Sequence, residues 1–398
     1  MTKGLTGLLA HRGVTVFRGC AALQNAHTVR VTPAEGETQV SRSVEAGVFE
    51  PVETELAIDA DDVVLATGSR PLALPGNPFA GALIDSTQAL ELNTLPSSAV
   101  IIGAGAVALE FASLWNAAGC EVTLLIRKDR VLSTWERRAS MTLTRELKRR
   151  GVNVIARTAV DRVDTGANLG ATVHYRQGDS DEDRTAYGEV VLAAIGRVPN
   201  TDADWFRSSG LKLDERGYVT VDGYGRTNLD GVWALGDITP GHALAHRAFE
   251  QGITIAEKIA GADPKPVLDD TVPQVVFSFP EAASVGLTLD QAKAREDVVE
   301  PKETAYPMLS NARMLMSGEG GSMTVVSGAF ANNPDMQVVL GVHIVSPIAS
   351  DLIAEAEQLV GNRVPLADAA RLIHPHPTFS ETLGEALLKA DGRPLHTR

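Results

Sequence analysis

Short apolar runs with little polar alternation recur along the chain. They are Asp62–Pro71, Ser98–Ile102, Glu121–Ile126 and Glu189–Ala194. Such runs are typical of strands covered on both faces, as in a parallel sheet. A helix running to about Ala118 separates the second run from the third, and the helical spacing from Glu136 to Arg150 places Leu143 and Leu147 on one face. Strands that alternate with helices predict an α/β fold.

The flanking segments follow weaker patterns. Residues 3–12 predict a short helix, and residues 14–17 and 28–31 predict strands. The polar, acidic stretch 33–57 has no clear period, so we expect an exposed excursion there. Further strands are predicted at 152–155, within 159–176, at 218–222 and at 231–235, followed by a helix from Ala243 to about Ala260.

From Thr271 onward the pattern changes. Strands are predicted at 274–279, 284–287, 323–326 and 338–344, and helices at 350–360, 366–372 and 381–389. Strands grouped ahead of helices are typical of a separate α+β domain with an antiparallel sheet. The prolines and acidic residues of 264–273 mark its beginning.

Composition narrows the class of protein. The 398 residues predict about two or three domains, and no apolar run is long enough to span a bilayer. The formal net charge of −14 repels polyanions and argues against nucleic acid as a partner. The first ten residues lack a secretory signal, so we expect a cytoplasmic protein. Cys20 and Cys120 lie far apart without a redox or zinc spacing, and each is predicted to be a small core residue; no metal site is predicted.

The strand at 98–102 runs directly into a glycine turn and a helix. Gly103 permits a tight turn, Gly105 lets a pyrophosphate approach, and the small Ala108 lets helix and strand pack closely. The phosphates then lie at a helix N-terminus, which favours anions. In this strand–turn–helix–strand setting, the pattern predicts a dinucleotide site.

The second strand of this unit ends in Ile126, Arg127 and Lys128, where an NAD site has an acidic residue for the ribose hydroxyls. Two cations cannot accept those hydrogen bonds, but they can neutralise a 2′-phosphate. The hypothesis is a preference for NADP(H) over NAD(H). The alternative is a solvated basic turn.

Two other strands end in small residues. Thr67, Gly68 and Ser69 follow one, and Gly196 follows another. Each tip lets a ligand or a second backbone come close, although a plain strand end is an alternative. The repeated layout predicts two dinucleotide-binding modules. Asp237, just past a later strand, is placed to bind a sugar hydroxyl or merely to cap a turn. The helix start that follows offers amides to a cofactor and comprises Ala243, Leu244, Ala245 and His246.

A histidine motif precedes the last predicted helix. His376 is followed five residues later by Glu381, so the pair can act as a base and its orienting carboxylate. The alternative is a loop with two histidines, His374 and His376, before a helix capped by Ser380.

Together these motifs resemble the pyridine nucleotide-disulfide oxidoreductase family of flavoenzymes, and the resemblance covers essentially the whole chain. The motifs occur in the family's order: Ala66-Thr-Gly68, Gly103-Ala-Gly105 with Glu110, Ile195-Gly-Arg-Val-Pro-Asn200, Ala234-Leu-Gly-Asp237, Leu244-Ala-His246 and His376-Pro-Thr-Phe-Ser-Glu381. The double-histidine motif is most similar to dihydrolipoamide dehydrogenases, whereas Arg127 resembles the NADPH-binding turn of glutathione reductases.

The resemblance implies that FAD contacts Thr67–Ser69, Asp237 and residues 243–246, and that NAD(P) lies at residues 103–110, 126–127 and Gly196. It also implies a homodimer formed by the C-terminal domain, with His376 as the proton shuttle and a dithiol, disulfide or lipoyl domain as the substrate. The expected segments are a partial FAD-binding domain (1–95), an NAD(P)-binding Rossmann domain (96–215), a return segment of the FAD domain (216–270) and a dimerisation domain (271–398).

One departure from the family pattern concerns the redox centre. The family's first FAD-binding strand, its glycine turn and its Cys-x-x-x-x-Cys helix are absent from this sequence. The hypothesis is that the chain is an N-terminally truncated form whose FAD module is incomplete. The alternatives to a dihydrolipoamide dehydrogenase are an NADPH-dependent disulfide reductase of the glutathione or mycothione type and an inactive dinucleotide-binding protein.

Overall fold

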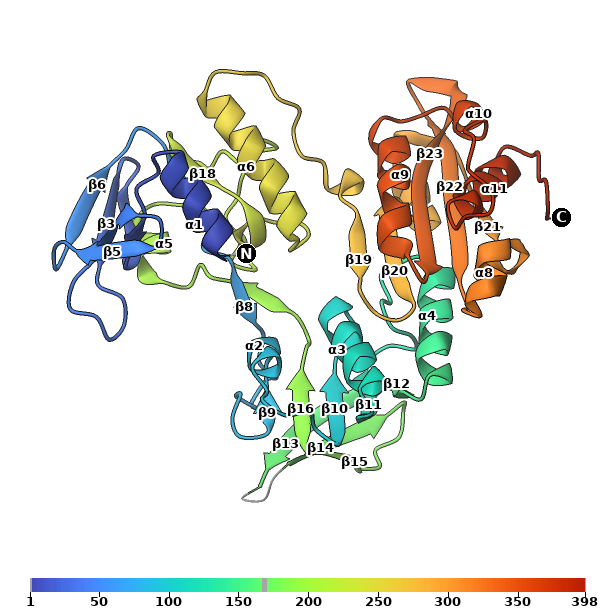
Figure 1. Ribbon diagram of the computed structural model, residues 1–398, viewed down its shortest axis with the longest axis horizontal. Helices are drawn as coiled ribbons and strands as arrows, with labels where there is room; N and C mark the ends of the chain where they lie inside the picture. Colours follow the sequence, from blue (N-terminus) through green and yellow to red (C-terminus); the bar gives the residue numbers. More distant parts are fainter. Residues whose placement is uncertain (1, 167–169, 398) are drawn as a thin grey trace. The chain divides into compact units, whose positions relative to one another are not determined.

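The computed structural model describes residues 2–166 and 170–397. The chain forms two compact units, each built from two segments (Figure 1). Unit 1 comprises Met1–Arg70 and Val198–Val267, and unit 2 comprises Pro71–Arg197 and Leu268–Arg398. The strands β8 (Ser69–Pro71) and β17 (Arg197–Pro199) pair where the chain passes between the units. The domain borders expected near residues 95, 215 and 270 stay a prediction.

Unit 1 begins with helix α1 (Thr2–His11), as expected, followed by two small antiparallel sheets. The first sheet has the order β1-β4-β5, with strands Phe17–Arg18, Ser41–Glu45 and Val48–Pro51. The second sheet has the order β2-β3-β6, with strands Cys20–Asn25, Thr28–Thr32 and Leu56–Asp59. Residues 33–57 are mostly exposed, as predicted, but they contain the regular strands β4, β5 and the start of β6, which the lack of an apolar period did not reveal. Of these strands, β4 pairs with β1 and with β5.

The centre of unit 1 is a parallel pair of strands, β7 (Val63–Leu65) and β18 (Val232–Ala234). Its core also contains Phe206 from α5 (Asp204–Ser208) and Ile238 from the short helix η1 (Gly236–Ile238). Helix α6 (Ala245–Ile259) confirms the predicted helix. The strand predicted at 218–222 is reduced to one isolated bridge, Leu213–Val219, because no neighbouring strand continues the ladder there.

The first part of unit 2 contains a parallel sheet in the order β12-β11-β10-β16-β9. Its strands and helices are β9 (Leu83–Ile84), α2 (Ser86–Leu90), β10 (Ser98–Ile102), α3 (Ala106–Ala117), β11 (Glu121–Ile126), α4 (Arg137–Arg149), β12 (Asn153–Ala156) and β16 (Val190–Ala193). Three of the four apolar runs, those that begin at Ser98, Glu121 and Glu189, form its central strands, which are buried on both faces. Leu143 and Leu147 of α4 lie in the core, as their spacing predicted.

An antiparallel sheet in the order β13-β14-β15 follows β12. Its strands are Thr158–Thr165, Ala171–Gln177 and Arg184–Gly188. They confirm the strands expected within 159–176, except that residues 167–169 lie outside the described residues.

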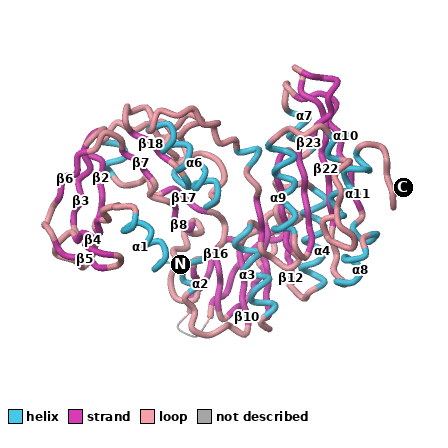
Figure 2. The backbone as a smooth tube through the Cα atoms, turned by 45° about the horizontal axis from the view of Figure 1, so that its top comes forward, coloured by secondary structure: helices cyan, strands magenta, loops and turns pink. Residues whose placement is uncertain are grey.

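The second part of unit 2 is an α+β fold around an antiparallel sheet in the order β19-β20-β23-β22-β21. The strands are Gln274–Val276, Glu281–Gly286, Asn333–Ser346, Ser322–Phe330 and Val298–Tyr306, in that order. The helices are η2 (Asp269–Thr271), α7 (Leu289–Ala294), η3 (Met308–Ser310), α8 (Ala312–Ser317), α9 (Ala349–Gly361), α10 (Leu366–Ala369) and α11 (Glu381–Ala390). Figure 2 shows the strands side by side, with α9 and α11 near them. The core between them includes Ile353 and Leu387.

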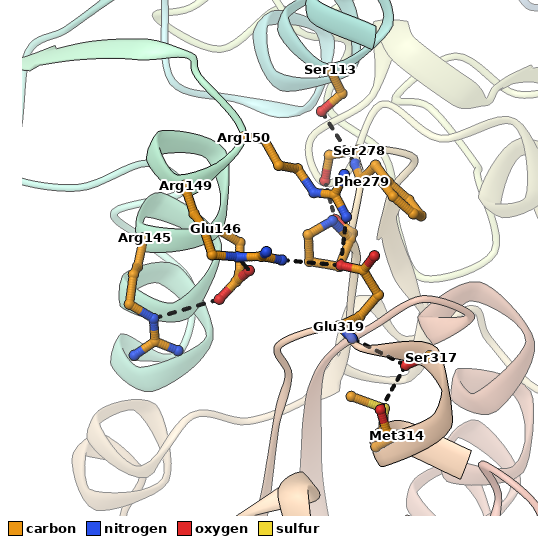
Figure 3. Close-up of polar contacts among 11 residues, drawn as sticks. Ser113, Arg145, Glu146, Arg149, Arg150, Ser278, Phe279, Met314, Ser317 and Glu319 are labelled. Carbon is orange, nitrogen blue, oxygen red and sulfur yellow. Dashed lines mark hydrogen bonds and ion pairs between the residues drawn. The ribbon is translucent and has the colours of Figure 1, made fainter.

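Apolar and polar contacts join the two parts of unit 2. Val276, Ala282 and Val345 from the second part lie in the same core as the parallel sheet. In addition, Glu319 accepts hydrogen bonds from Arg149, the last residue of α4, and from Arg150, which follows it, as Figure 3 shows. Because apolar burial and charged hydrogen bonds act together, we expect the two parts to unfold together.

Candidate functional site

The predicted glycine turn lies between β10 and α3. Gly103 has a φ of +144°, and a Cβ atom there would overlap the carbonyl oxygen of Ala194 at the end of β16. This position therefore requires glycine for two reasons, its conformation and its space. Gly105 is the N-cap of α3, and an added Cβ would meet no atom within 4 Å. The backbone amides of the helix start thus face an open space where an anion can bind.

A cavity of about 680 Å³ opens beside this turn. Of the predicted residues, Gly103, Gly105, Arg127, Lys128 and Gly196 line it. They come from the ends of three neighbouring strands, β10, β11 and β16, which the parallel sheet places at one edge. A cavity of this size at the carboxyl ends of parallel strands is the usual location of a nucleotide site in such folds.

Three of the residues predicted to bind the nicotinamide dinucleotide do not line the cavity. Ile126 and Ala108 are completely buried, and Ala108 packs near Gly103, as its small size predicted. Glu110 instead accepts a hydrogen bond at Oε1 from the backbone N–H of Phe277, with the N and O atoms 3.0 Å apart. Glu110 therefore connects α3 to the C-terminal part of unit 2.

Sequence reasoning missed other residues of the cavity. They are Pro71, Leu72, Leu74, Pro75, Ser86, Ser133, Thr158 and Arg197, among others. Most lie in loops or at strand ends without a motif of their own. Arg197, beside Gly196, was the one with a usable signal, because it is a cation within a quoted strand-end motif.

The charges at the end of β11 favour an anion. Arg127 and Lys128 are both exposed and both line the cavity. The next acidic residue, Asp129, pairs with Arg130, with 3.0 Å between Oδ1 and NH1. The backbone N–H of Arg157 donates to the carbonyl of Lys128 and holds this segment against the start of β13. A site with two cations and a neutralised carboxylate suits a phosphate better than a pair of ribose hydroxyls.

The structure brings His376 and Glu381 together in the C-terminal part of unit 2. Nδ1 of His376 lies 2.8 Å from Oε1 of Glu381, and the backbone N–H of Thr378 donates to the other carboxylate oxygen at 2.7 Å. Burial raises the pKa of Glu381, but the hydrogen bonds from Thr378 and His376 outweigh it, so the pKa lies below its usual range. The carboxylate is therefore ionised at neutral pH and oriented toward the imidazole.

The His376 ring is accessible to a substrate. Its side chain is 76% exposed, whereas that of Glu381 is 22% exposed. Ser380 occupies the N-cap position of α11 without capping the helix through its side chain; its hydroxyl lies 2.9 Å from that of Thr378. With Nδ1 engaged by Glu381, Nε2 is the nitrogen that can exchange a proton with a reacting group.

Unit 1 brings its predicted residues into one region. Ser69 Oγ donates to Asp237 Oδ2 at 2.6 Å, and Thr67 Oγ1 donates to the carbonyl of Asn200 at 2.9 Å. Gly68 has a φ of +71°, which favours glycine. Helix α6 begins at Ala245, with Leu244 as its N-cap, so Ala243 precedes it and His246 lies in its first turn.

Two family models match this sequence. "Pyridine nucleotide-disulphide oxidoreductase" matches residues 1–252, and the dimerisation domain of the same family matches residues 272–387. The chain belongs to the pyridine nucleotide-disulphide oxidoreductase family. Its members are FAD-dependent oxidoreductases that use a pyridine nucleotide, and this oxidoreductase is of the dihydrolipoyl dehydrogenase-like type.

Curated relatives of this oxidoreductase include dihydrolipoyl dehydrogenases. That of Geobacillus stearothermophilus is 35% identical over 402 residues, covering 100% of this chain and 78% of the relative, and that of Cupriavidus necator is 34% identical over 399 residues with the same coverage. Among solved structures, LpdA from Mycobacterium tuberculosis has a TM-score of 0.76 at 28% identity, covering 95% of this chain and 76% of LpdA. The fold is also shared with the flavoprotein disulfide reductase RclA from Escherichia coli, with a TM-score of 0.77 at 24% identity and coverage of 93% and 77%.

The residues of this oxidoreductase fit a nicotinamide dinucleotide more completely than FAD. In unit 2, β10 leads through a glycine turn into α3, beside a cavity. In the described residues of unit 1, β7 leads instead to β8, and β18 leads to the short helix η1. The pair Ser69–Asp237 fits a hydroxyl-bearing chain such as ribitol, but neither of these two strands supplies a second phosphate-binding turn.

The two cysteines differ in their exposure to solvent. Cys20 and Cys120 are both free thiols; Cys120 is buried, but Cys20 is exposed, so the prediction that each is a core residue was wrong for Cys20. Cys20 begins an edge strand of unit 1, where one side of the strand faces solvent.

No helix in the described part of the chain is long and apolar enough to cross a membrane.

Proposed function

We propose that the cavity of unit 2 binds NADP(H) in preference to NAD(H). The pyrophosphate lies against the amides at the start of α3, next to Gly105, and Arg127 and Lys128 hold the 2′-phosphate. The observation that carries this proposal is the pair of exposed cations lining the cavity at the end of β11, where an NAD site has a carboxylate. Asp129 does not take that role, because it is paired with Arg130.

Titration of the purified chain with NADPH and with NADH, followed by nicotinamide fluorescence, tests the preference. We expect NADPH to bind about tenfold more tightly, since one charge–phosphate contact is worth about 1–2 kcal/mol. Arg127→Glu should remove or reverse the preference, because it repels the 2′-phosphate. Arg145→Glu is the matched control, as Arg145 is an exposed cation of the same unit outside the cavity wall. Equal or tighter binding of NADH by the wild type would contradict the proposal.

We also propose that His376 transfers a proton to and from a dithiol substrate, with Glu381 orienting its ring. The hydrogen bond of 2.8 Å fixes Nδ1 toward the carboxylate and leaves Nε2 to accept the thiol proton. The ionised Glu381 stabilises the imidazolium that forms. The exposure of the ring supports access by a substrate as large as a lipoyl group carried on a protein domain.

Oxidation of dihydrolipoamide tests this role in a form of the protein joined to the family's first FAD-binding segment and Cys-x-x-x-x-Cys helix, which are absent from this sequence. Because general acid–base groups contribute about 10²–10⁴-fold, His376→Gln should lower kcat by about that factor, and Glu381→Gln by a smaller one. His396→Gln is the control: it removes a histidine paired with Glu385 of the same helix at the same distance, 2.8 Å. A small disulfide as the better substrate would instead favour a disulfide reductase of the glutathione or mycothione type. Wild-type turnover preserved in His376→Gln would overturn the role of this residue.

We propose further that the protein is a homodimer formed through its C-terminal part. The match to the family's dimerisation domain supports this, as do highly exposed apolar side chains there, such as Ile373 (97%) and Met316 (72%). Analytical ultracentrifugation should give twice the mass of one chain. A monomer across the micromolar range would contradict the proposal.

A further inference from the structure

The side chain of His374 is mostly shielded from solvent, although it lies two residues from the exposed ring of His376. The side chain of His374 is 10% exposed, whereas that of His376 is 76% exposed. Nε2 of His374 lies 2.9 Å from Oε1 of Glu355 on α9. This contact, which is only partly exposed to water, joins the start of segment 374–380 to α9 and anchors that end of the segment.

Gly384 lies directly beneath the His374 ring. This glycine is buried inside α11, and a Cβ atom there would overlap Nδ1 of the ring and lie 2.8 Å from its Cε1. A glycine inside a helix costs about 1 kcal/mol relative to alanine, and the backbone here has no left-handed φ that requires one. The close contact between the His374 ring and the helix backbone therefore explains why position 384 is a glycine.

A second anchor holds the other side of His376. Asn311 Nδ2 donates to the carbonyl of Thr378 at 3.0 Å, and Thr378 Oγ1 donates to the carbonyl of Pro375 at 2.7 Å. The N–H of Thr378 donates to Glu381 as well. The backbone of His376 is thus fixed from both directions. An exposed ring gains little orientation from its own packing, so these backbone anchors decide where it points.

We infer that His374 is a positioning residue. Through its hydrogen bond to Glu355 and its contact with Gly384, it fixes the backbone position from which the His376 side chain contacts Glu381. The inference deepens, and rests on, the role in proton transfer proposed for His376. His374 itself contacts α9 and α11, and it acts through the segment that follows it.

Protonation of His374 strengthens this anchor. The hydrogen bond to Glu355 raises the pKa of His374 above its usual value; burial opposes this and is the smaller effect. The charge of Glu355, the carbonyl of Leu372 and the charge of Glu381 act in the same direction as the hydrogen bond. The protonated ring donates from Nε2 to a carboxylate, which is a charge-assisted hydrogen bond and stronger than a neutral one.

NMR spectra of the full chain with isotope-labelled histidine rings test the inference without any cofactor. The ring nitrogens of His376 report whether Nδ1 is hydrogen-bonded to Glu381. Glu381→Gln provides the reference spectrum for a His376 ring that has lost its carboxylate. We expect His374→Ala and Gly384→Ala each to move the His376 signals more than half of the way toward that reference. His374→Gln, which can still donate to Glu355, should restore part of the wild-type signal.

The double variant His374→Ala/Gly384→Ala separates positioning from packing. Its added methyl group occupies space vacated by the ring, so it should recover much of the stability that Gly384→Ala loses, yet its His376 signals should stay displaced. His396→Ala is the matched control, because it removes a histidine–glutamate pair from the same helix, and it should leave the His376 signals unchanged.

Unchanged His376 signals in folded His374→Ala would overturn the inference. If that variant does not fold, Glu355→Ala, which keeps the ring and removes its hydrogen-bond acceptor, decides the matter by the same spectra. The failure of this inference can be told apart from the failure of the role proposed for His376. Full turnover by His376→Gln would contradict that role, whereas the spectra would still report the orientation of the His376 ring.

Discussion

Arg150 lies over the ring of Phe279, with its Cζ atom 3.8 Å from the ring centroid. The same guanidinium donates to Glu319 at 2.5 Å, so the residue that caps the end of α4 contacts two points of the C-terminal part (Figure 3). Cation–π contacts are worth about 0.5–2 kcal/mol, and hydrogen bonds to charged groups about 1.5–3 kcal/mol. We expect Arg150→Ala to lower the free energy of unfolding by about 2–4 kcal/mol, measured by urea denaturation.

Arg145→Ala serves as the control for Arg150. The Arg145 side chain is 68% exposed and lies 3.6 Å from the buried carboxylate of Glu146, which keeps a closer hydrogen bond from Arg149 at 2.7 Å, so we expect a loss of at most about 1 kcal/mol. A loss in Arg145→Ala as large as that in Arg150→Ala would show that the general charge of α4, rather than the contacts of Arg150, stabilises the unit.

Gly103→Ala and Gly105→Ala should have different consequences. At Gly103 the added methyl group overlaps Ala194 and the φ is unfavourable, so we expect a loss of about 1–3 kcal/mol in stability together with loss of nucleotide binding. At Gly105 the space is open and the backbone is extended, so stability should hold within about 0.5 kcal/mol. NADPH affinity should still fall, because the methyl group enters the path of the pyrophosphate. Thermal unfolding and fluorescence titration measure both effects, and Gly105→Ala with full affinity would place the phosphates elsewhere.

Stability should fall in mild acid because of His343. Its ring is completely buried; Nδ1 lies 2.7 Å from Ser284 Oγ and Nε2 lies 3.2 Å from the carbonyl of Leu287. Burial lowers the pKa of His343 below its usual value, although the charge of Glu136 and the bond to Leu287 oppose this. Below about pH 6.5 the unfolded chain binds a proton that the folded chain does not, so the free energy of unfolding decreases as pH falls.

Denaturation at about pH 7.5 and about pH 5 measures this contribution. His343→Gln should be less stable than the wild type at the higher pH but should lose less stability between the two. An identical loss in both proteins would assign the pH dependence to other groups.

The two thiols should differ in reactivity. Burial, with the nearby carboxylates of Glu189 and Glu121, raises the pKa of Cys120 to about 11, so it has almost no thiolate at neutral pH. Cys20 is exposed. In the native protein a thiol reagent should modify Cys20 rapidly and Cys120 only after unfolding. Cys20→Ser should abolish the rapid phase, and rapid modification of Cys120 in that variant would contradict its burial.

Local sequence was sufficient where an element depends on its own residues. The runs that became β10, β11 and β16 are apolar because both faces of the sheet are covered, and Gly103 is required by the turn itself. Local sequence was not sufficient for β4 and β5, because their exposed side chains carry no apolar period, and β4 also pairs with β1 from an earlier part of the chain. Cys20 was misplaced for a related reason, since burial of a small apolar residue depends on whether its strand lies at an edge.

The sequence by itself determined the glycine turn, the cations after it and the spacing of His376 and Glu381, because each of these is a short-range pattern with a direct chemical meaning. Only the tertiary structure decided that Arg127 and Gly196 share one cavity, that Glu110 binds the backbone of Phe277, and that His374 lies on Gly384. Each of these contacts joins segments that meet only through packing. No period or motif within one segment carries that information, because the partner is set by how the strands and helices assemble.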